Sequence, residues 1–167
     1  PDVFALLDKF KEEGLIKNYG VSVEKVEEGL KAIEYPGVST VQIIYNMFRQ
    51  RPADLFMREA MKKDVGVICR VPLASGLLTG KFSKGEEFNE GDHRQFNREG
   101  EAFDKGETFA GVPFEVGVDA VEHLNQFKPE GVTMAQFALK WILQRRSSVG
   151  CVIVGCKNLK HRHFFRY

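Results

Sequence analysis

Cysteines and long apolar runs are scarce in this sequence, and each scarcity excludes a class of protein. Three cysteines among 167 residues form no C-x-x-C pair, which argues against a disulfide framework and against a zinc site. We interpret Cys69, Cys151 and Cys156 as buried or incidental thiols. No apolar run approaches the roughly 20 residues that a membrane-spanning helix requires, and no basic-then-apolar secretory signal opens the chain. The expectation is a cytoplasmic protein without a membrane partner.

An excess of charge of either sign is also missing. Lys and Arg total 24 against 23 for Asp and Glu, so the net charge of +1 gives no electrostatic reason to expect nucleic acid. The phosphate-binding patterns G-x-G-x-x-G and G-x-x-x-x-G-K-S/T do not occur. With 43% apolar and 28% charged residues, the composition is that of one globular domain, which we take to span residues 1–167.

Short apolar strands alternate with amphipathic helices along most of the chain. The periodicity predicts helices before the first strand, between strands and over residues 134–144, with N-terminal caps at Asp2, Ser22 and Thr133. This alternation is typical of right-handed βαβ units, so the predicted class is α/β with four parallel strands. The four strands are predicted at residues 15–21, 39–45, 65–71 and 151–154.

One connection, after the third strand, interrupts the alternation. Residues 82–113 are rich in Gly and charged side chains and lack sustained periodicity, and the segment is too long for an idle loop. It is interpreted either as a flexible insertion or as a lid or substrate loop at the carboxyl ends of the strands. Isolated phenylalanines favour a segment that packs when closed: Phe88, Phe96, Phe103 and Phe109.

Four strands alone would leave two apolar sheet edges unpaired. A (β/α)8 barrel closes such edges but needs about 250 residues, so this sequence supplies about half of one. A flavodoxin-like or Rossmann sheet is the competing architecture, and the missing phosphate motif argues against it. Either the other half-barrel lies outside this sequence, or two half-barrels pair.

Four segments, in order, resemble the second half of the barrel of the aldo-keto reductases. They are KNYGVS at residues 17–22, VQIIYN at 41–46, RVPLASGLLTGK at 70–81 and VIVGCKN at 152–158. The resemblance covers nearly the whole chain, and the ordered set is more specific than any one segment. It implies the last four βα units of a TIM barrel and an NADPH-dependent reduction of a small aldehyde or ketone substrate to the alcohol.

The resemblance assigns the nicotinamide to the ends of the first three strands. Ser22 and Gln42 end consecutive strands, and their side chains suit the carboxamide that the family holds there. For Ser22, a plain helix cap is an equal alternative. Arg70 occupies the place where many relatives put an aromatic residue against the nicotinamide ring, and a planar guanidinium also stacks on rings.

The loops after the third and fourth strands are assigned to the phosphates. In the turn at residues 72–76, backbone groups and a serine hydroxyl would approach the pyrophosphate, and a simple tight turn is the alternative. Gly155 and Lys157 match the family's loop for the adenosine 2'-phosphate, which favours NADPH over NADH. The full cofactor assignment is Ser22, Gln42, Arg70, Val71, Pro72, Leu73, Ser75, Gly76, Lys81, Gly155, Lys157 and His161.

The family's catalytic residues are not found. In the family a tyrosine is the general acid, a lysine and an aspartate tune its pKa, and a histidine orients the carbonyl, all on the first four strands. Tyr19, Tyr35 and Tyr45 stand in none of these motifs, so no catalytic residue is assigned and the chain alone is predicted inactive. Residues 161–167 depart from the family's last helix, and the pair His161 and His163 lacks the third ligand of a metal site.

Three functions therefore compete. The leading interpretation is the cofactor-binding half of an NADPH-dependent carbonyl reductase. The second is a non-catalytic half-barrel that binds nicotinamide cofactor. The third is an interaction module whose sheet edges pair into a symmetric dimer.

Overall fold

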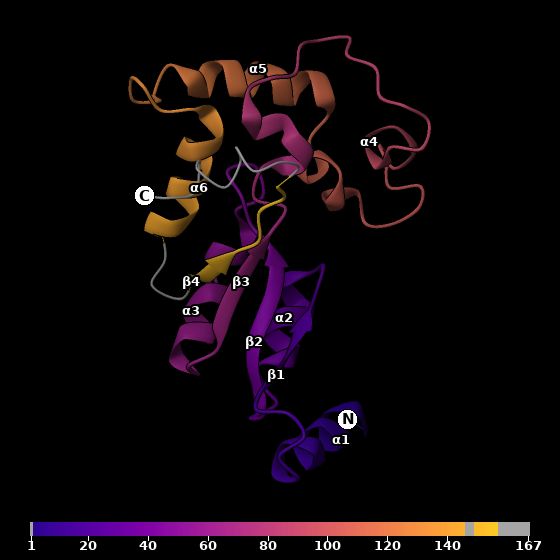
Figure 1. Cartoon of the computed structure of the whole chain (residues 1–167), viewed down its shortest axis with the longest axis vertical. Helices are drawn as coiled ribbons and strands as arrows, with labels where there is room; N and C mark the ends of the chain where they lie inside the picture. The colour runs from indigo at the N-terminus through magenta and orange to yellow at the C-terminus, as the bar shows by residue number, and fades with distance from the viewer. Residues whose placement is uncertain (1, 146–148, 157–167) are drawn as a thin grey trace.

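A four-stranded parallel sheet forms the centre of the molecule in the computed structural model, which describes residues 2–145 and 149–156. The strands are β1 (Tyr19–Ser22), β2 (Val38–Ile44), β3 (Gly66–Arg70) and β4 (Val149–Val152), in the spatial order β1-β2-β3-β4. All three strand pairs are parallel, as predicted, so the four carboxyl ends lie at one edge of the sheet. Helix α5 and the long insertion lie beyond that edge (Figure 1).

The helices connect and cover these strands. The larger ones are α1 (Asp2–Glu12), α2 (Val26–Ala32), α3 (Phe56–Lys62), α5 (Phe114–Asn125) and α6 (Met134–Arg145). The shorter ones are η1 (Arg51–Ala53), η2 (Ala74–Thr79), α4 (His93–Phe96), η3 (Lys105–Glu107) and η4 (Phe109–Gly111). Among the described residues, no helix has the length and apolar character needed to cross a membrane.

Two helix starts test the predicted caps. Thr133 and Gln136 form the predicted capping box before α6, because the Thr133 amide donates to Gln136 Oε1 at 2.9 Å and the Gln136 amide donates to Thr133 Oγ1 at 3.2 Å. The cap predicted at Ser22 is wrong. Ser22 is the last residue of β1, and α2 begins after Lys25, whose amide donates to the Glu28 carboxylate at 3.1 Å.

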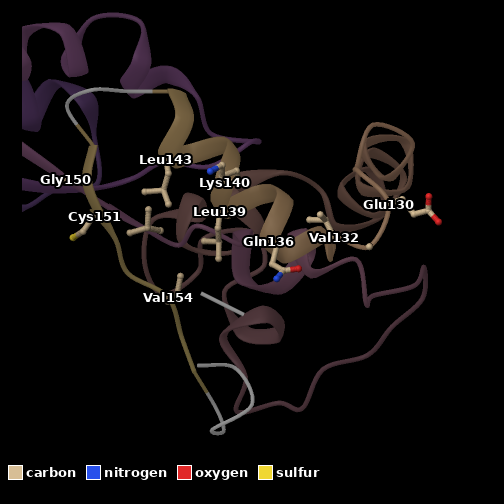
Figure 2. A pocket seen from close by; sticks show the side chains of 11 residues that line it. Glu130, Val132, Gln136, Leu139, Lys140, Leu143, Gly150, Cys151 and Val154 are labelled. Carbon is tan, nitrogen blue, oxygen red and sulfur yellow. The ribbon is translucent and has the colours of Figure 1, made fainter. Parts of the chain in front are cut away.

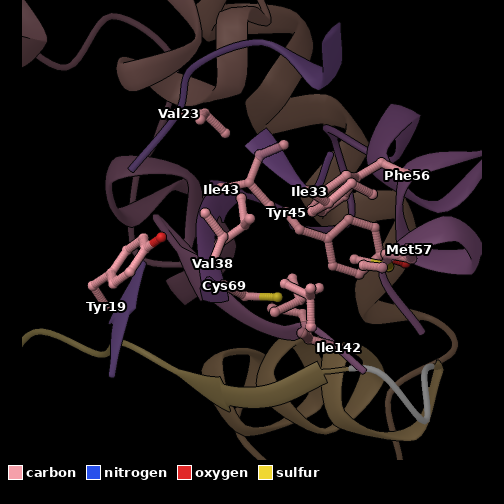
Figure 3. Close-up of a cluster of buried hydrophobic side chains, with 14 residues drawn as sticks. Tyr19, Val23, Ile33, Val38, Ile43, Tyr45, Phe56, Met57, Cys69 and Ile142 are labelled. Atoms are coloured by element: carbon pink, nitrogen blue, oxygen red, sulfur yellow. The ribbon is translucent and has the colours of Figure 1, made fainter. Parts of the chain in front are cut away.

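The main apolar core lies between one face of the sheet and the helices. Alternate residues of β2 and β3 are buried there, including Ile43 and Cys69, and they pack with Phe56 of α3 and Ile142 of α6 (Figure 3). Burial raises the pKa of the Cys69 thiol to about 12, so this thiol is a core group. The opposite face of the sheet is open: Ser22 and Cys151, which share a row across the strands with Gln42 and Ile68, are both exposed.

A second apolar cluster joins the insertion to α5 and α6. It includes Leu77, Leu78, Phe109, Phe114, Val121, Met134 and Ala138, with Phe82 and Phe88 packed against it. The Phe88 ring meets Phe114 edge to face, with centroids 5.6 Å apart, and Phe96 meets Phe103 in the same way at 6.1 Å. Residues 82–113 are therefore a folded element packed on the barrel segment.

Phe56 provides a test of the main core. Its ring is fully buried, so Phe56→Ala should lower the free energy of unfolding by about 3–5 kcal/mol through lost apolar contact and the cavity left behind. Phe127 is 64% exposed, and Phe127→Ala should change stability by less than about 0.5 kcal/mol. Urea unfolding followed by circular dichroism measures both, and equal losses would contradict the described packing.

Candidate functional site

The candidate site begins with a pair of polar side chains on neighbouring strands. Ser22 and Gln42 are register partners at the carboxyl ends of β1 and β2, and the Ser22 hydroxyl donates to Gln42 Oε1 at 3.1 Å. The Gln42 amide nitrogen makes no hydrogen bond within the described part of the chain, so its two N–H groups can donate to a ligand. The pair thus offers a donor from Gln42 and an acceptor oxygen from Ser22, which is the complement of a carboxamide.

The turn after β3 has an unusual backbone. Val71, Ala74 and Ser75 have φ values of 51°, 47° and 56°, in the left-handed region that side chains with a Cβ rarely adopt, and Gly76 has a φ of 103°. Each such non-glycine residue costs about 1–3 kcal/mol unless its surroundings hold it. Strained turns of this kind concentrate at binding sites, and this is the turn to which the sequence analysis assigned the pyrophosphate.

Asn46 holds this turn and was missing from the sequence assignment. It is fully buried, its Nδ2 donates to the Val71 carbonyl at 2.9 Å, and its Oδ1 accepts from the amides of Phe48 at 2.9 Å and Arg49 at 3.0 Å. One side chain therefore fixes both the loop after β2 and the turn after β3. A polar residue directly after an apolar strand was the available clue, because burial there demands hydrogen bonds.

Ser75 and Gly76 are both in contact with residues of the insertion. The Ser75 hydroxyl donates to the Glu107 carbonyl at 2.8 Å and accepts from the Phe109 amide at 3.2 Å. A Cβ placed on Gly76 would lie 3.0 Å from the Phe82 ring, so the aromatic ring occupies the close approach that glycine permits. Of the other assigned residues nearby, Pro72 is buried, Val71 and Leu73 are half-buried and Lys81 is exposed.

Arg70 lies at the end of β3 and is held by two groups. It forms an ion pair with Glu107, and its Nη2 donates to the Val23 carbonyl at 3.0 Å. Only 15% of the Arg70 side chain and 20% of the Glu107 side chain are exposed, so solvent screens this pair weakly. Arg70 Nε is buried and has no hydrogen-bond partner among the described residues.

Arg49, in the loop after β2, makes the same two kinds of contact as Arg70. Its Nη1 donates to Asp104 at 3.1 Å and its Nη2 to the Glu24 carbonyl at 2.9 Å. Burial alone would raise the pKa of Asp104, but hydrogen bonds from Arg49 and from the Gly106 amide outweigh burial and lower that pKa. Two arginines therefore connect the β1–α2 loop to two acids of the insertion.

Tyr19 lies at the opposite edge of the sheet. It opens β1 rather than ending it, and its hydroxyl donates to Asp8 at 2.7 Å. Burial, the hydrogen bond to Asp8 and the charge of Asp8 together raise the pKa of Tyr19 to about 12. A tyrosine so placed lies at the opposite end of β1 from Ser22, and its raised pKa makes it poorly suited to donate a proton near neutral pH.

The last predicted contacts lie after β4. Gly155 is exposed, and Lys157 and His161 lie outside the described residues. A hollow of about 740 Å³ lies between α6 and β4, lined mainly by aliphatic side chains such as Leu139, Leu143 and Val154 (Figure 2). None of the predicted cofactor residues that the structure describes lines this hollow, which lies beside the outer strand β4 and not at the candidate site. Within the described part, no three His, Cys, Asp or Glu side chains are grouped to hold a metal ion.

Comparison with known proteins gives a family match over nearly all of the chain. The model of the aldo/keto reductase family matches residues 1–163. Among curated proteins, the chain is 25% identical over 162 residues to the NADP(+) aldo-keto reductase yakc of Schizosaccharomyces pombe, which covers 95% of this chain and 45% of that protein.

Solved structures give the same picture of the fold. A glycerol dehydrogenase from Gluconobacter oxydans superposes with a TM-score of 0.68 at 25% identity, covering 87% of this chain and 42% of that one. An aldo-keto reductase from Klebsiella pneumoniae in complex with NADPH superposes with a TM-score of 0.52 at 17% identity, covering 92% and 43%.

The chain spans less than half the length of each of these relatives. Its four-stranded sheet is a partial (β/α)8 barrel, which confirms the predicted fold class. Because the family model, the curated relative and the superposed structures agree over nearly the full sequence, the chain belongs to the aldo/keto reductase family.

Proposed function

We propose that this chain is the cofactor-binding half of an NADP(H)-dependent oxidoreductase that reduces an aldehyde or ketone to the alcohol. The observation that carries the proposal is the Ser22–Gln42 pair beside the strained turn at residues 71–76, at the carboxyl ends of three adjacent strands. That edge is where barrel enzymes assemble their sites. Membership of the aldo/keto reductase family, and relatives whose names include NADP(+) or NADPH, support the same reading.

The residues at this edge fit a nicotinamide nucleotide. Gln42 would donate from its amide nitrogen to the carboxamide oxygen of the nicotinamide, and Ser22 would accept from the carboxamide nitrogen. Arg70, with a buried Nε that lacks a partner, would lie near the ring or the first phosphate. When bound, the nicotinamide supplies the hydride, and the residues described here position it. Lys157 would add a charge partner for a 2'-phosphate, which is the basis for proposing NADPH.

The exposed edges of the sheet support a missing half-barrel as the partner. Before β1, Val3 and Leu6 of α1 are 67% and 49% exposed, and beside β4, Leu143 and Ile153 are 51% and 47% exposed. The hollow between α6 and β4 adjoins the exposed apolar side chains beside β4. Because the chain covers less than half of its relatives, we propose an N-terminal half-barrel as the occupant of both edges.

Replacing Gln42 tests the nicotinamide contact. Gln42→Ala removes the side-chain N–H groups proposed to donate to the carboxamide of the nicotinamide. We therefore expect the NADPH dissociation constant to rise about tenfold, the effect of one lost hydrogen bond of ordinary strength. Isothermal titration calorimetry on the full 167-residue chain gives the measurement. Gln126→Ala is the matched control, because Gln126 is exposed at the end of α5 and remote from the sheet edge. An unchanged affinity for Gln42→Ala would remove Gln42 from the site.

The second prediction separates binding from turnover. Of the described tyrosines on this side of the chain, Tyr19 opens β1 and donates to Asp8, and Tyr45, which follows β2, is buried in the apolar core. We therefore expect no NADPH oxidation above background when the purified chain is mixed with 4-nitrobenzaldehyde and followed at the cofactor's absorbance. Saturable oxidation that depends on aldehyde concentration would contradict this expectation. Loss of that oxidation in Gln42→Ala would then place the activity at this site.

The third prediction concerns the sheet edges. If an N-terminal half-barrel is the natural occupant, the chain alone should be a monomer by native mass spectrometry. The Cys151 thiol, exposed on the open face of β4, should then react freely with a thiol reagent in a Cys156→Ser background, whereas buried Cys69 should react only on unfolding. A dimer mass with Cys151 protected would instead show that a second copy covers the edges.

A further inference from the structure

Arg70 brings a positive charge next to the Ser22–Gln42 pair. It lies on the same face of β3 as Ile68, the register partner of Gln42, and is displaced from Ile68 by two residues, about 6–7 Å, toward the carboxyl edge. Its Nη2 reaches across β2 and donates to the Val23 carbonyl at 3.0 Å. Because Val23 directly follows Ser22, the Arg70 side chain extends from the end of β3 to the end of β1.

The charge of Arg70 is only weakly screened by solvent. Just 15% of its side chain is exposed, and its Nε is buried without a hydrogen-bond partner among the described residues. The electric field of this guanidinium is therefore weakened much less than that of an exposed arginine. Glu107, whose side chain is 20% exposed, pairs with Arg70 and offsets part of this field. The two charges act in opposite senses on a ligand at the strand ends.

A nicotinamide held by Ser22 and Gln42 would lie beside Arg70. The carboxamide is bonded directly to the nicotinamide ring, so the ring must follow the carboxamide to these strand ends. The ring is neutral in NADPH and carries a positive charge in NADP+. A cationic ring is repelled by a neighbouring guanidinium, whereas a neutral ring is not. The phosphates carry the same charges in both forms, so a contact between Arg70 and a phosphate would not distinguish the two forms.

We propose that Arg70 is a specificity-determining residue whose charge selects the reduced cofactor over the oxidised one. This inference rests on the proposed function, because it concerns the same cofactor site. Arg70 raises the dissociation constant of NADP+ relative to that of NADPH, and Glu107 moderates this effect. In the direction of reduction, the site fills with NADPH and more readily releases the NADP+ that remains after hydride transfer.

The ratio of the NADP+ dissociation constant to the NADPH dissociation constant tests this selection. Isothermal titration calorimetry on the full chain gives both constants, and their ratio cancels effects that are equal for the two forms. Arg70→Gln removes the positive charge, and Glu107→Gln removes the charge that offsets it. The matched controls Lys84→Gln and Glu90→Gln remove exposed charges of the same signs elsewhere in the insertion. Near-ultraviolet circular dichroism and the urea midpoint check that each variant keeps its fold.

The two substitutions should move this ratio in opposite directions. We expect Arg70→Gln to lower it about fivefold and Glu107→Gln to raise it about threefold, with both controls unchanged. Lost packing would weaken both forms together and leave the ratio as it was. An unchanged ratio in both variants would overturn the proposal, and so would shifts in the same direction. If Arg70→Gln does not keep its fold, Glu107→Gln decides alone, and a ratio that fails to rise overturns the proposal.

Failure of the proposed function gives a different result. If neither NADPH nor NADP+ binds to the unsubstituted chain or to any variant, the cofactor assignment is wrong and the selection by Arg70 is wrong with it. If both forms bind and Gln42→Ala weakens both, but the charge variants leave the ratio unchanged, the cofactor site stands and only the selection by Arg70 is wrong.

Discussion

Parallel pairing of the four strands is the constraint on which the rest of this structure depends. Because every strand runs in the same direction, the loops after β1, β2 and β3 all leave from one edge of the sheet, and Ser22, Gln42 and Arg70 meet there. The pairing is stabilised by apolar residues on one face, where Ile43 and Cys69 pack with the helices. The other face carries the polar row of Ser22 and Gln42, so burial of one face leaves the second available for a ligand.

The loops at that edge are held by a few buried polar groups. Asn46 makes one hydrogen bond to the strained turn after β3 and accepts two from the loop after β2, so it ties the two loops together. Arg49 and Arg70 each bond a backbone carbonyl of the β1–α2 loop and an acid of the insertion. Ion pairs and charged hydrogen bonds are strongest where solvent is excluded, and the side chains of both ion pairs are mostly buried.

The family match and the described geometry both concern the carboxyl ends of the strands. The family model covers the chain from residue 1 to 163, and the chain spans less than half the length of the relatives it matches. The insertion adds a feature that membership alone does not reveal. It folds as a packed element with its own aromatic cluster and reaches Arg70, Ser75 and Gly76.

Sequence patterns by themselves determined the order and type of the main elements. Apolar periodicity located all four strands and helix α6, with strand ends displaced by up to four residues, because pairing in space and not local composition decides where a strand begins. The sequence predicted Ser22 and Gln42 at the carboxyl ends of consecutive strands, and the two are register partners. The helix cap predicted at Ser22 is wrong, because α2 begins after Lys25. Ordered motifs were also enough to indicate the family.

Only the tertiary structure decided how the site residues are used. Glu107 lies 37 positions from Arg70 and Asp104 lies 55 from Arg49, so no local spacing could pair them. Asn46 was visible as a polar residue after an apolar strand, but its three partners come from two loops that meet only when β2 and β3 align. Residue type and periodicity specify what a side chain can bond, whereas its actual partner depends on which loops the parallel sheet brings to the same edge.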